Sequence, residues 1–160
     1  MLTEITGDLL KIENGIICHQ VNYHGAMGGG VAAAIAENIL TDEQYKAYVD
    51  YCKELGPDAL GTVQFTGEEN GLIVANMFCQ DEALADPRIK KAQNITDYDA
   101  MRKCLVRVRS MAIKLGKRIY FPRNMGCGIA GGSWDTVLFL LRDIFAEYPV
   151  EAYIVGRPGK

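Results

Sequence analysis

Two glycine-rich stretches of this sequence have the residue types that could hold an anion. Gly28, Gly29 and Gly30 follow an apolar run and lead into an alanine-rich segment, and residues 126–132 (GCGIAGG) separate another apolar run from a segment that Ser133 can cap. Glycines expose backbone N–H groups, and the N-terminus of a following helix favours negative charge. Neither stretch matches a Walker loop or GxGxxG. Two such loops facing each other could clamp a diphosphate; the alternative is two unrelated connectors between strands and helices.

Three side chains near the ends of apolar runs could take part in proton transfer or ligand recognition. His19 and His24 are candidates for a general acid or base because an imidazole titrates at about pH 6.5. Either histidine could instead be a structural or surface residue. Asp8 follows the first apolar run, and its carboxylate could accept a hydrogen bond from the amino group of a nucleobase. By itself, this position favours a simple turn aspartate.

Composition limits the class of partner. The net charge of the 160 residues is -3, so nothing draws the chain to nucleic acid or to a membrane over long range. We expect no membrane segment and no signal peptide, and therefore a cytoplasmic protein. The five cysteines form no CxxC pair, which predicts buried, reduced thiols and no metal site. They are Cys18, Cys52, Cys79, Cys104 and Cys127.

Strand-like and helix-like segments alternate along the chain. Apolar runs bounded by turn residues predict strands at residues 2–6, 15–21, 61–66, 72–78, 118–121 and 151–155. Apolar spacings of three and four predict helices at residues 27–38, 42–55, 97–115 and 133–147. We expect residues 80–94 to form a long loop beside the site and residues 156–160 to be a frayed end. This order predicts a single α/β domain over residues 1–160 with a largely parallel sheet, which binds its ligand at the carboxyl ends of the strands.

Three motifs together resemble the macrodomain family. They are Gly7-Asp-Leu, His19-x-x-Asn22 before Met27-Gly-Gly-Gly-Val-Ala32, and Gly126-Cys-Gly-Ile-Ala-Gly-Gly-x-Trp134. The resemblance spans residues 2–155, and it is greatest to the branch with the ADP-ribose-1″-phosphate phosphatases and the terminal ADP-ribose protein glycohydrolase. It implies a three-layer α/β/α fold around a mixed, largely parallel six-stranded sheet.

The resemblance also implies a role for each matched position. Asp8 would bind the adenine amino group beside the backbone of Leu9. Asn22 would touch the distal ribose, and His19 matches a histidine thought to be catalytic in the yeast-type phosphatase. The two loops would bind the diphosphate and distal ribose from opposite sides through Gly28, Gly29, Gly30 and Val31, and through the backbone N–H groups of Gly126, Cys127, Gly128, Ile129 and Ala130.

The sequence departs from the family in two respects. The glycohydrolase branch that forms a lysine adduct needs a lysine after the fourth strand, but residues 74–80 (VANMFCQ) contain none, and Ala130 stands where its aspartate is expected. The Asn-Ala-Ala-Asn motif of the commonest hydrolytic macrodomains is also missing. The lysine-adduct mechanism therefore does not fit this chain.

Three functions remain open. We expect an enzyme that binds ADP-ribose and converts ADP-ribose 1″-phosphate to ADP-ribose and phosphate, with His19 and Asn22 as the candidate catalytic residues and no cofactor or metal. The first alternative is a binding module that holds ADP-ribose, free or on a protein, without turnover. The second is a hydrolase of ADP-ribosyl or O-acetyl-ADP-ribose esters that uses a water positioned by the ligand. Nucleic acid is the partner that the charge favours least.

Overall fold

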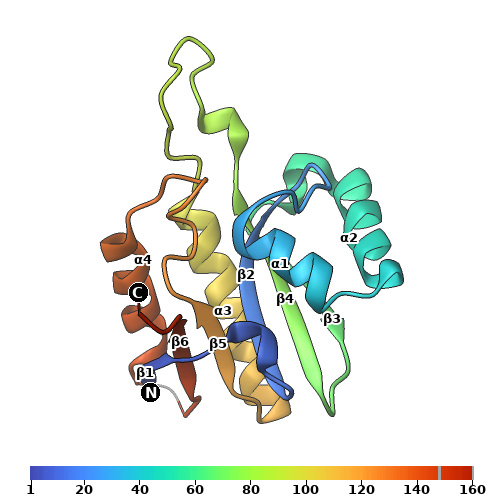
Figure 1. The fold of residues 1–160 in the computed structure, drawn as a ribbon, viewed down its shortest axis with the longest axis vertical. Helices are drawn as coiled ribbons and strands as arrows, with labels where there is room; N and C mark the ends of the chain where they lie inside the picture. The colour runs from blue at the N-terminus through green and yellow to red at the C-terminus, as the bar shows by residue number, and fades with distance from the viewer. Residues whose placement is uncertain (148, 160) are drawn as a thin grey trace.

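The structure, a computed structural model, describes residues 1–147 and 149–159. Within these residues, six strands form one mixed sheet in the order β1-β6-β5-β2-β4-β3 (Figure 1). The strands are β1 (Leu2–Thr6), β2 (Gly15–Asn22), β3 (Val63–Gly67), β4 (Leu72–Gln80), β5 (Ile119–Pro122) and β6 (Ala152–Gly156). All neighbours run parallel except the edge strand β3, which is antiparallel to β4. The predicted mixed, largely parallel sheet is confirmed.

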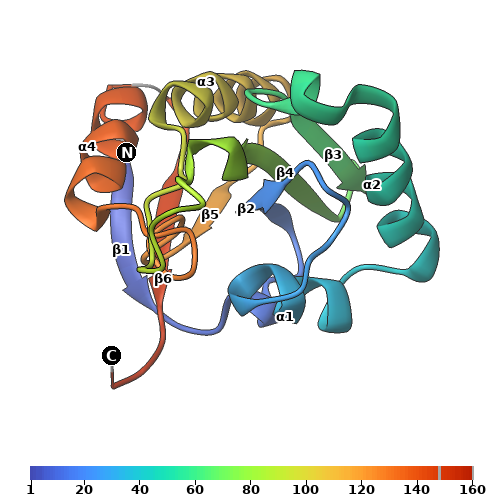
Figure 2. The same cartoon turned by 90° about the horizontal axis from the view of Figure 1, so that it is seen from above.

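Helices cover both faces of this sheet. They are α1 (Gly30–Asn38), α2 (Asp42–Leu55), α3 (Tyr98–Leu115) and α4 (Trp134–Phe145), with short 3-10 turns η1 (Leu9–Lys11), η2 (Gly56–Ala59) and η3 (Glu82–Leu84). Figure 2 shows α3 and α4 on one face, α1 on the opposite face and α2 beyond the β3 edge. The arrangement is the expected three-layer α/β/α fold.

Alternation along β2 assigns its side chains to the two layers. Ile16 and Cys18 are buried with α3 and α4, whereas Ile17 is buried with Ile35 of α1 and Val21 with α2. Successive strand residues point to opposite faces, so His19 must lie on the same face as Ile17 and Val21. This parity places an imidazole under α1, next to the first glycine loop (residues 23–29).

Side-chain caps fix where the predicted helices begin. Thr41 forms a capping box with Gln44 before α2, and Asp97 caps α3. Ser133 caps α4, as the sequence predicts. A cap satisfies backbone N–H groups that have no partner within the helix. The start of α1 differs from the other three because its N-cap is Gly29, which has no side chain to offer.

Some predicted boundaries are wrong by a few residues. The helix expected at residues 27–38 begins at Gly30, because Gly29 has an extended backbone with φ -151° and ψ 160°. The helix expected at 133–147 ends at Phe145. The loop expected at 80–94 starts later, since Gln80 belongs to β4, and it contains η3. The end expected to fray at 156–160 begins inside β6, where Gly156 pairs with Thr6; Lys160 lies outside the described residues.

The cysteines are free thiols, and four of the five are buried. Burial raises the pKa of Cys18 and of Cys79 well above the usual value for a thiol. Cys127 is the exception to the prediction. It is half-buried because it lies in the second glycine loop (residues 123–133) and not in a strand or helix.

Candidate ligand-binding site

A cleft made of two adjoining cavities lies at the carboxyl ends of β2, β5 and β6. The larger cavity, of about 560 Å³, is bordered by the two glycine loops, with His19 and Gln80 in its wall. The smaller, of about 410 Å³, is bordered by Asp8 and by the end of β6. Both cavities are lined by Val31, Pro122, Arg123 and Asn124. Because they share this wall, the cleft can take a long ligand that spans both, as expected at this edge of a parallel sheet.

The first glycine loop leaves open space along the cleft. A Cβ atom added at Gly28 or at Gly30 would meet no atom within 4 Å. No side chain caps the start of α1, so its first N–H groups are left for a ligand. The backbone of Gly30 is left-handed, with φ +58°, which a residue with a side chain rarely adopts. Both the space and the conformation fit a loop that lets an anion approach the backbone closely.

The second glycine loop contains glycines of two kinds. A Cβ at Gly126 would lie 2.8 Å from Gln20 Oε1, and one at Gly132 would lie 2.5 Å from the carbonyl oxygen of Gly126. Gly131 is equally crowded, with Gln93 O at 2.5 Å. By contrast, a Cβ at Gly128 would meet nothing within 4 Å. The first three glycines are therefore needed to fold the loop, whereas Gly128 leaves room in the cleft.

Ile129 connects the two loops across the larger cavity. Its side chain is 77% exposed, yet its Cδ1 atom would lie 2.6 Å from a Cβ added at Gly29. The side chain thus reaches the opposite loop, a contact that the resemblance did not imply because it assigned only backbone groups to this position. A ligand between the loops would be covered by an apolar side chain from above.

Cys127 does not take the predicted place in the cleft wall. Its Sγ donates a hydrogen bond to Met125 O at 3.3 Å, and its backbone N–H donates to Asn124 O at 2.9 Å. Since this N–H already has a partner inside the loop, it is not available to a phosphate. Every other predicted site residue lines one of the two cavities: Asp8, Leu9, His19, Asn22, Gly28, Gly29, Gly30, Val31, Gly126, Gly128, Ile129 and Ala130.

Two residues that the sequence analysis missed lie where the cavities meet. Arg123 and Asn124 are exposed and line both cavities. Asn124 has a left-handed backbone with φ +66°, which is uncommon for a residue other than glycine and recurs at ligand sites. Arg123 brings a positive charge to the middle of the cleft. The Pro-Arg-Asn turn directly before the glycines was the available signal for both.

The smaller cavity contains the predicted base-recognition residue. Asp8 is exposed, and its Oδ1 accepts a hydrogen bond from Leu10 N at 2.9 Å, which caps η1. The turn role that the sequence favoured for Asp8 is therefore present, and a second carboxylate oxygen remains to meet a ligand. Arg157, which the sequence analysis did not single out, lines the same cavity.

His19 is buried in the wall of the larger cavity and belongs to a row of polar side chains. It is 1% exposed, and its Nε2 lies 2.6 Å from Asn76 Oδ1. Asn76 Nδ2 donates in turn to Gln64 Oε1 at 3.2 Å. The other imidazole nitrogen, Nδ1, is buried without a hydrogen-bond partner. Burial lowers the pKa of His19 to about 4, although the hydrogen bond with Asn76 opposes this shift. The imidazole is therefore neutral at pH 7.

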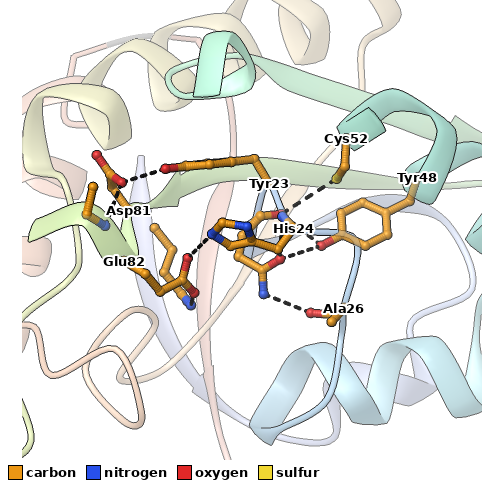
Figure 3. Close-up of polar contacts among 10 residues, drawn as sticks. Tyr23, His24, Ala26, Tyr48, Cys52, Asp81 and Glu82 are labelled. Carbon is orange, nitrogen blue, oxygen red and sulfur yellow. Dashed lines mark hydrogen bonds and ion pairs between the residues drawn. The ribbon is translucent and has the colours of Figure 1, made fainter. Parts of the chain in front are cut away.

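Asn22 holds the first glycine loop in shape. Its Nδ2 donates to Ala26 O at 2.8 Å, and its Oδ1 accepts from His24 N at 2.9 Å and from Tyr48 OH at 3.2 Å (Figure 3). Asn22 is among the residues that line the larger cavity, and its contact with a distal ribose stays a prediction. Its amide group is nevertheless used to close the turn.

The second histidine, His24, is not among the residues that line either cavity. His24 Nε2 lies 2.5 Å from Glu82 Oε2, and the neighbouring Tyr23 OH donates to Asp81 Oδ1 at 2.7 Å (Figure 3). The bond to Asp81 is the main reason that the pKa of Tyr23 is raised to about 12. These contacts tie the first glycine loop to the end of β4. His24 thus helps to hold the first glycine loop against the end of β4, which agrees with the alternative that it is a structural or surface residue.

Across residues 1–147 and 149–159, no group of three or more His, Cys, Asp or Glu side chains comes together in a way that could hold a metal ion. None of the helices in this described part of the chain has the length and hydrophobicity needed to span a membrane.

Comparisons with known proteins give matches among solved structures. No protein-family model and no curated protein matches the chain. A protein from Bacteroides thetaiotaomicron is 29% identical with a TM-score of 0.81, over 98% of this chain and 99% of that chain. A macrodomain protein from Streptomyces coelicolor is 24% identical with a TM-score of 0.74, over 97% and 98%. DarTG from Thermosipho africanus, solved in complex with ADP-ribose, is 17% identical with a TM-score of 0.71, over 99% of this chain and 42% of that chain.

Proposed function

The chain has the macrodomain fold, and from this premise we propose that it binds ADP-ribose along the continuous cleft. The observation that carries the proposal is the wall shared by the two cavities, because it provides one elongated site with a different character at each end. The adenosine half would occupy the smaller cavity beside Asp8, and the distal ribose would lie in the larger cavity near His19 and Asn22. A neighbour with this fold, DarTG, was solved with ADP-ribose.

The middle of the cleft suits a diphosphate. The net charge of -3 cannot attract an anion over long range, so local groups must bind it. Those groups are the uncapped N-terminus of α1, the open backbone at Gly28 and Gly128, and the guanidinium of Arg123. Ile129 would close over the bound group and exclude water. Each contribution is local, which fits a protein that is acidic overall.

We further propose that the protein hydrolyses an ADP-ribose derivative, with ADP-ribose 1″-phosphate as the best candidate. A water oxygen bonds to phosphorus, the bond between phosphorus and the 1″ oxygen breaks, and that oxygen leaves with a proton as the sugar hydroxyl. His19 is the proton-transfer group, since it borders the larger cavity and is neutral at pH 7. Asn22 acts by keeping the first glycine loop in the shape that receives the distal ribose.

A non-catalytic ADP-ribose-binding module is the second candidate. It is favoured by the scarcity of acid–base side chains in the larger cavity, where His19 is only 1% exposed and His24 is paired with Glu82 outside the wall. Backbone clamps can bind a diphosphate without such groups. Turnover of ADP-ribose 1″-phosphate separates this candidate from the enzyme.

Calorimetric titration with ADP-ribose tests the binding proposal. We expect micromolar affinity, with AMP much weaker because it lacks the second phosphate and the distal ribose. Gly128→Glu puts a carboxylate into open space in the cleft, so the variant should fold and lose ADP-ribose. Ser110→Glu, an exposed position on α3, adds one negative charge away from the cleft and should bind normally. No binding at about 1 mM ligand, roughly -4 kcal/mol, would contradict the proposal.

Release of phosphate from ADP-ribose 1″-phosphate tests the reaction. If the protein is this phosphatase, we expect steady release of phosphate, which Gly128→Glu abolishes and Ser110→Glu preserves. Release of an acyl group or of a protein side chain instead of phosphate would identify an ester or ADP-ribosyl hydrolase. Tight binding of ADP-ribose without turnover of ADP-ribose 1″-phosphate would favour the non-catalytic binding module.

A further inference from the structure

Three neighbouring strands each contribute one polar side chain to the same face of the sheet. His19 of β2 is in register with Asn76 of β4, and Asn76 is in register with Gln64 of β3. The row continues from the cavity wall toward the edge of the sheet. His19 and Asn76 are 1% and 0% exposed, so the hydrogen-bond partners of both side chains must come from the protein or from a bound ligand and not from bulk solvent. Buried polar groups are mostly hydrogen-bonded, so a group in such a row that has no partner needs an explanation.

The hydrogen bonds in this row fix which imidazole nitrogen has the proton. Asn76 Nδ2 donates to Gln64 Oε1, so it is the carbonyl oxygen Oδ1 that faces the histidine. A carbonyl oxygen only accepts, and His19 Nε2 must therefore be the protonated nitrogen that donates to it. Nδ1 is then unprotonated, and its lone pair has no partner among the described residues.

We infer that Asn76 and Gln64 are positioning residues that hold His19 with Nδ1 as a hydrogen-bond acceptor for a hydroxyl group or water in the larger cavity. His19 is then a base and not an acid in the resting site. The inference rests on the proposed function, since the ligand hydroxyl or the attacking water supplies the missing donor. In the reaction, Nδ1 accepts a proton of the water as the water oxygen bonds to phosphorus, and it passes that proton to the 1″ oxygen as the bond between phosphorus and that oxygen breaks.

The surroundings of His19 keep it ready for this role. On its own strand the neighbours on the same face are Ile17 and Val21, which are apolar. Among the described residues lining the larger cavity, Arg123 is the one charged side chain, so no carboxylate in this lining favours a protonated imidazole. Burial likewise lowers the pKa of His19, to about 4. An unprotonated Nδ1 is therefore the resting form at neutral pH.

The ring nitrogens can be examined directly by ¹⁵N NMR of the imidazole side chains. The chain has two histidines, so His24→Gln assigns the signals of His19. We expect a protonated Nε2 and an unprotonated Nδ1 in the free protein, and a shift of the Nδ1 signal when ADP-ribose is added. A protonated Nδ1 would overturn the inference, and so would an Nδ1 signal that ADP-ribose leaves unchanged although calorimetry shows that it binds. If ADP-ribose does not bind, the proposed function fails while the free protein still decides the tautomer.

Variants of Asn76 test the positioning role by a pH profile. Asn76→Asp keeps an acceptor for Nε2–H but adds a negative charge, which should move the acid limb of phosphate release upward by about 1–3 pH units. Asn76→Leu leaves Nε2–H without an acceptor and should lower kcat by about 10²-fold while ADP-ribose affinity changes little. Gln64→Leu should act in the same direction more weakly. An unchanged acid limb in Asn76→Asp would refute the role, even if Asn76→Leu fails to fold.

Discussion

Replacing His19 by glutamine should remove a large part of the loss of stability at acidic pH. The glutamine amide can still donate to Asn76 Oδ1, so the row of polar groups is kept while the titrating group is lost. In the wild-type protein the pKa of His19 is about 4 in the folded state and about 6.5 in an exposed chain. The folded state thus disfavours the charged form.

The sign and size of the effect follow from this difference. Between pH 6.5 and pH 4 the unfolded chain binds a proton at His19 and the folded protein does not, so stability falls as the pH falls. At 1.36 kcal/mol for each pKa unit, the full loss is roughly 3 kcal/mol, of which about 2 kcal/mol falls between pH 7 and pH 5. This is a substantial part of the roughly 5–15 kcal/mol that stabilises a typical domain.

Urea unfolding of the wild type and of His19→Gln at pH 7 and pH 5 measures this loss of stability. The wild type should lose about 2 kcal/mol more than His19→Gln over this range. Other titrating groups are common to both proteins, so the difference isolates His19. His24→Gln is the matched control, because it removes an exposed histidine and should keep the steep loss. Parallel behaviour of wild type and His19→Gln would mean that the imidazole is not buried in a neutral form.

Three further substitutions test the cleft. Asp8→Ala should weaken ADP-ribose by about 10–150-fold in calorimetry through loss of a charge-assisted hydrogen bond, and a hypoxanthine analogue should show little additional loss in the variant; equal losses for both bases would leave Asp8 as a turn residue only. Gly126→Ala should lower the free energy of unfolding by about 1–2 kcal/mol, because the φ of Gly126 is +76° and an added Cβ would crowd Gln20. Gly128→Ala should lower it by less than about 0.5 kcal/mol, because its Cβ would meet open space. Similar urea midpoints for the two variants would refute the distinction between glycines needed for folding and glycines that leave space in the cleft. His19→Ala should weaken ADP-ribose binding by no more than about 10-fold, through loss of one hydrogen bond, and should lower phosphate release by about 10²–10⁴-fold; a wild-type rate would exclude proton transfer by His19.

The order of strands and helices could be predicted because its signals are local. Alternating apolar residues and caps such as Ser133 depend on a few neighbours in sequence, and the elements lie within a few residues of their expected places. The start of α1 was misplaced because Met27 is apolar and resembles a helical position. In the folded protein it is 5% exposed and belongs to the cluster around α2, while the helix begins only after Gly29.

The sequence predicted the two glycine loops of the cleft but not the side-chain contacts between neighbouring strands. His19 stands out in the sequence as a histidine near a glycine loop, but the register that brings Asn76 and Gln64 to it is a property of three paired strands. Asn76 gave a signal of its own, as a polar residue inside the apolar run at 72–79. Such a residue must find a buried partner, and the sequence alone does not say which one.

The glycines of the second loop show why a motif can be recognised without its parts being equivalent. Gly126, Gly131 and Gly132 are enclosed by atoms of the protein itself, and they fix the path of the chain before α4. Gly128 has no such neighbour, so folding does not require glycine there. A position without a folding requirement that is nevertheless glycine and faces a cavity indicates space reserved for a ligand. By the same reasoning Gly28 in the opposite loop has open space on its side of the cleft, and the two positions together define where the diphosphate would lie.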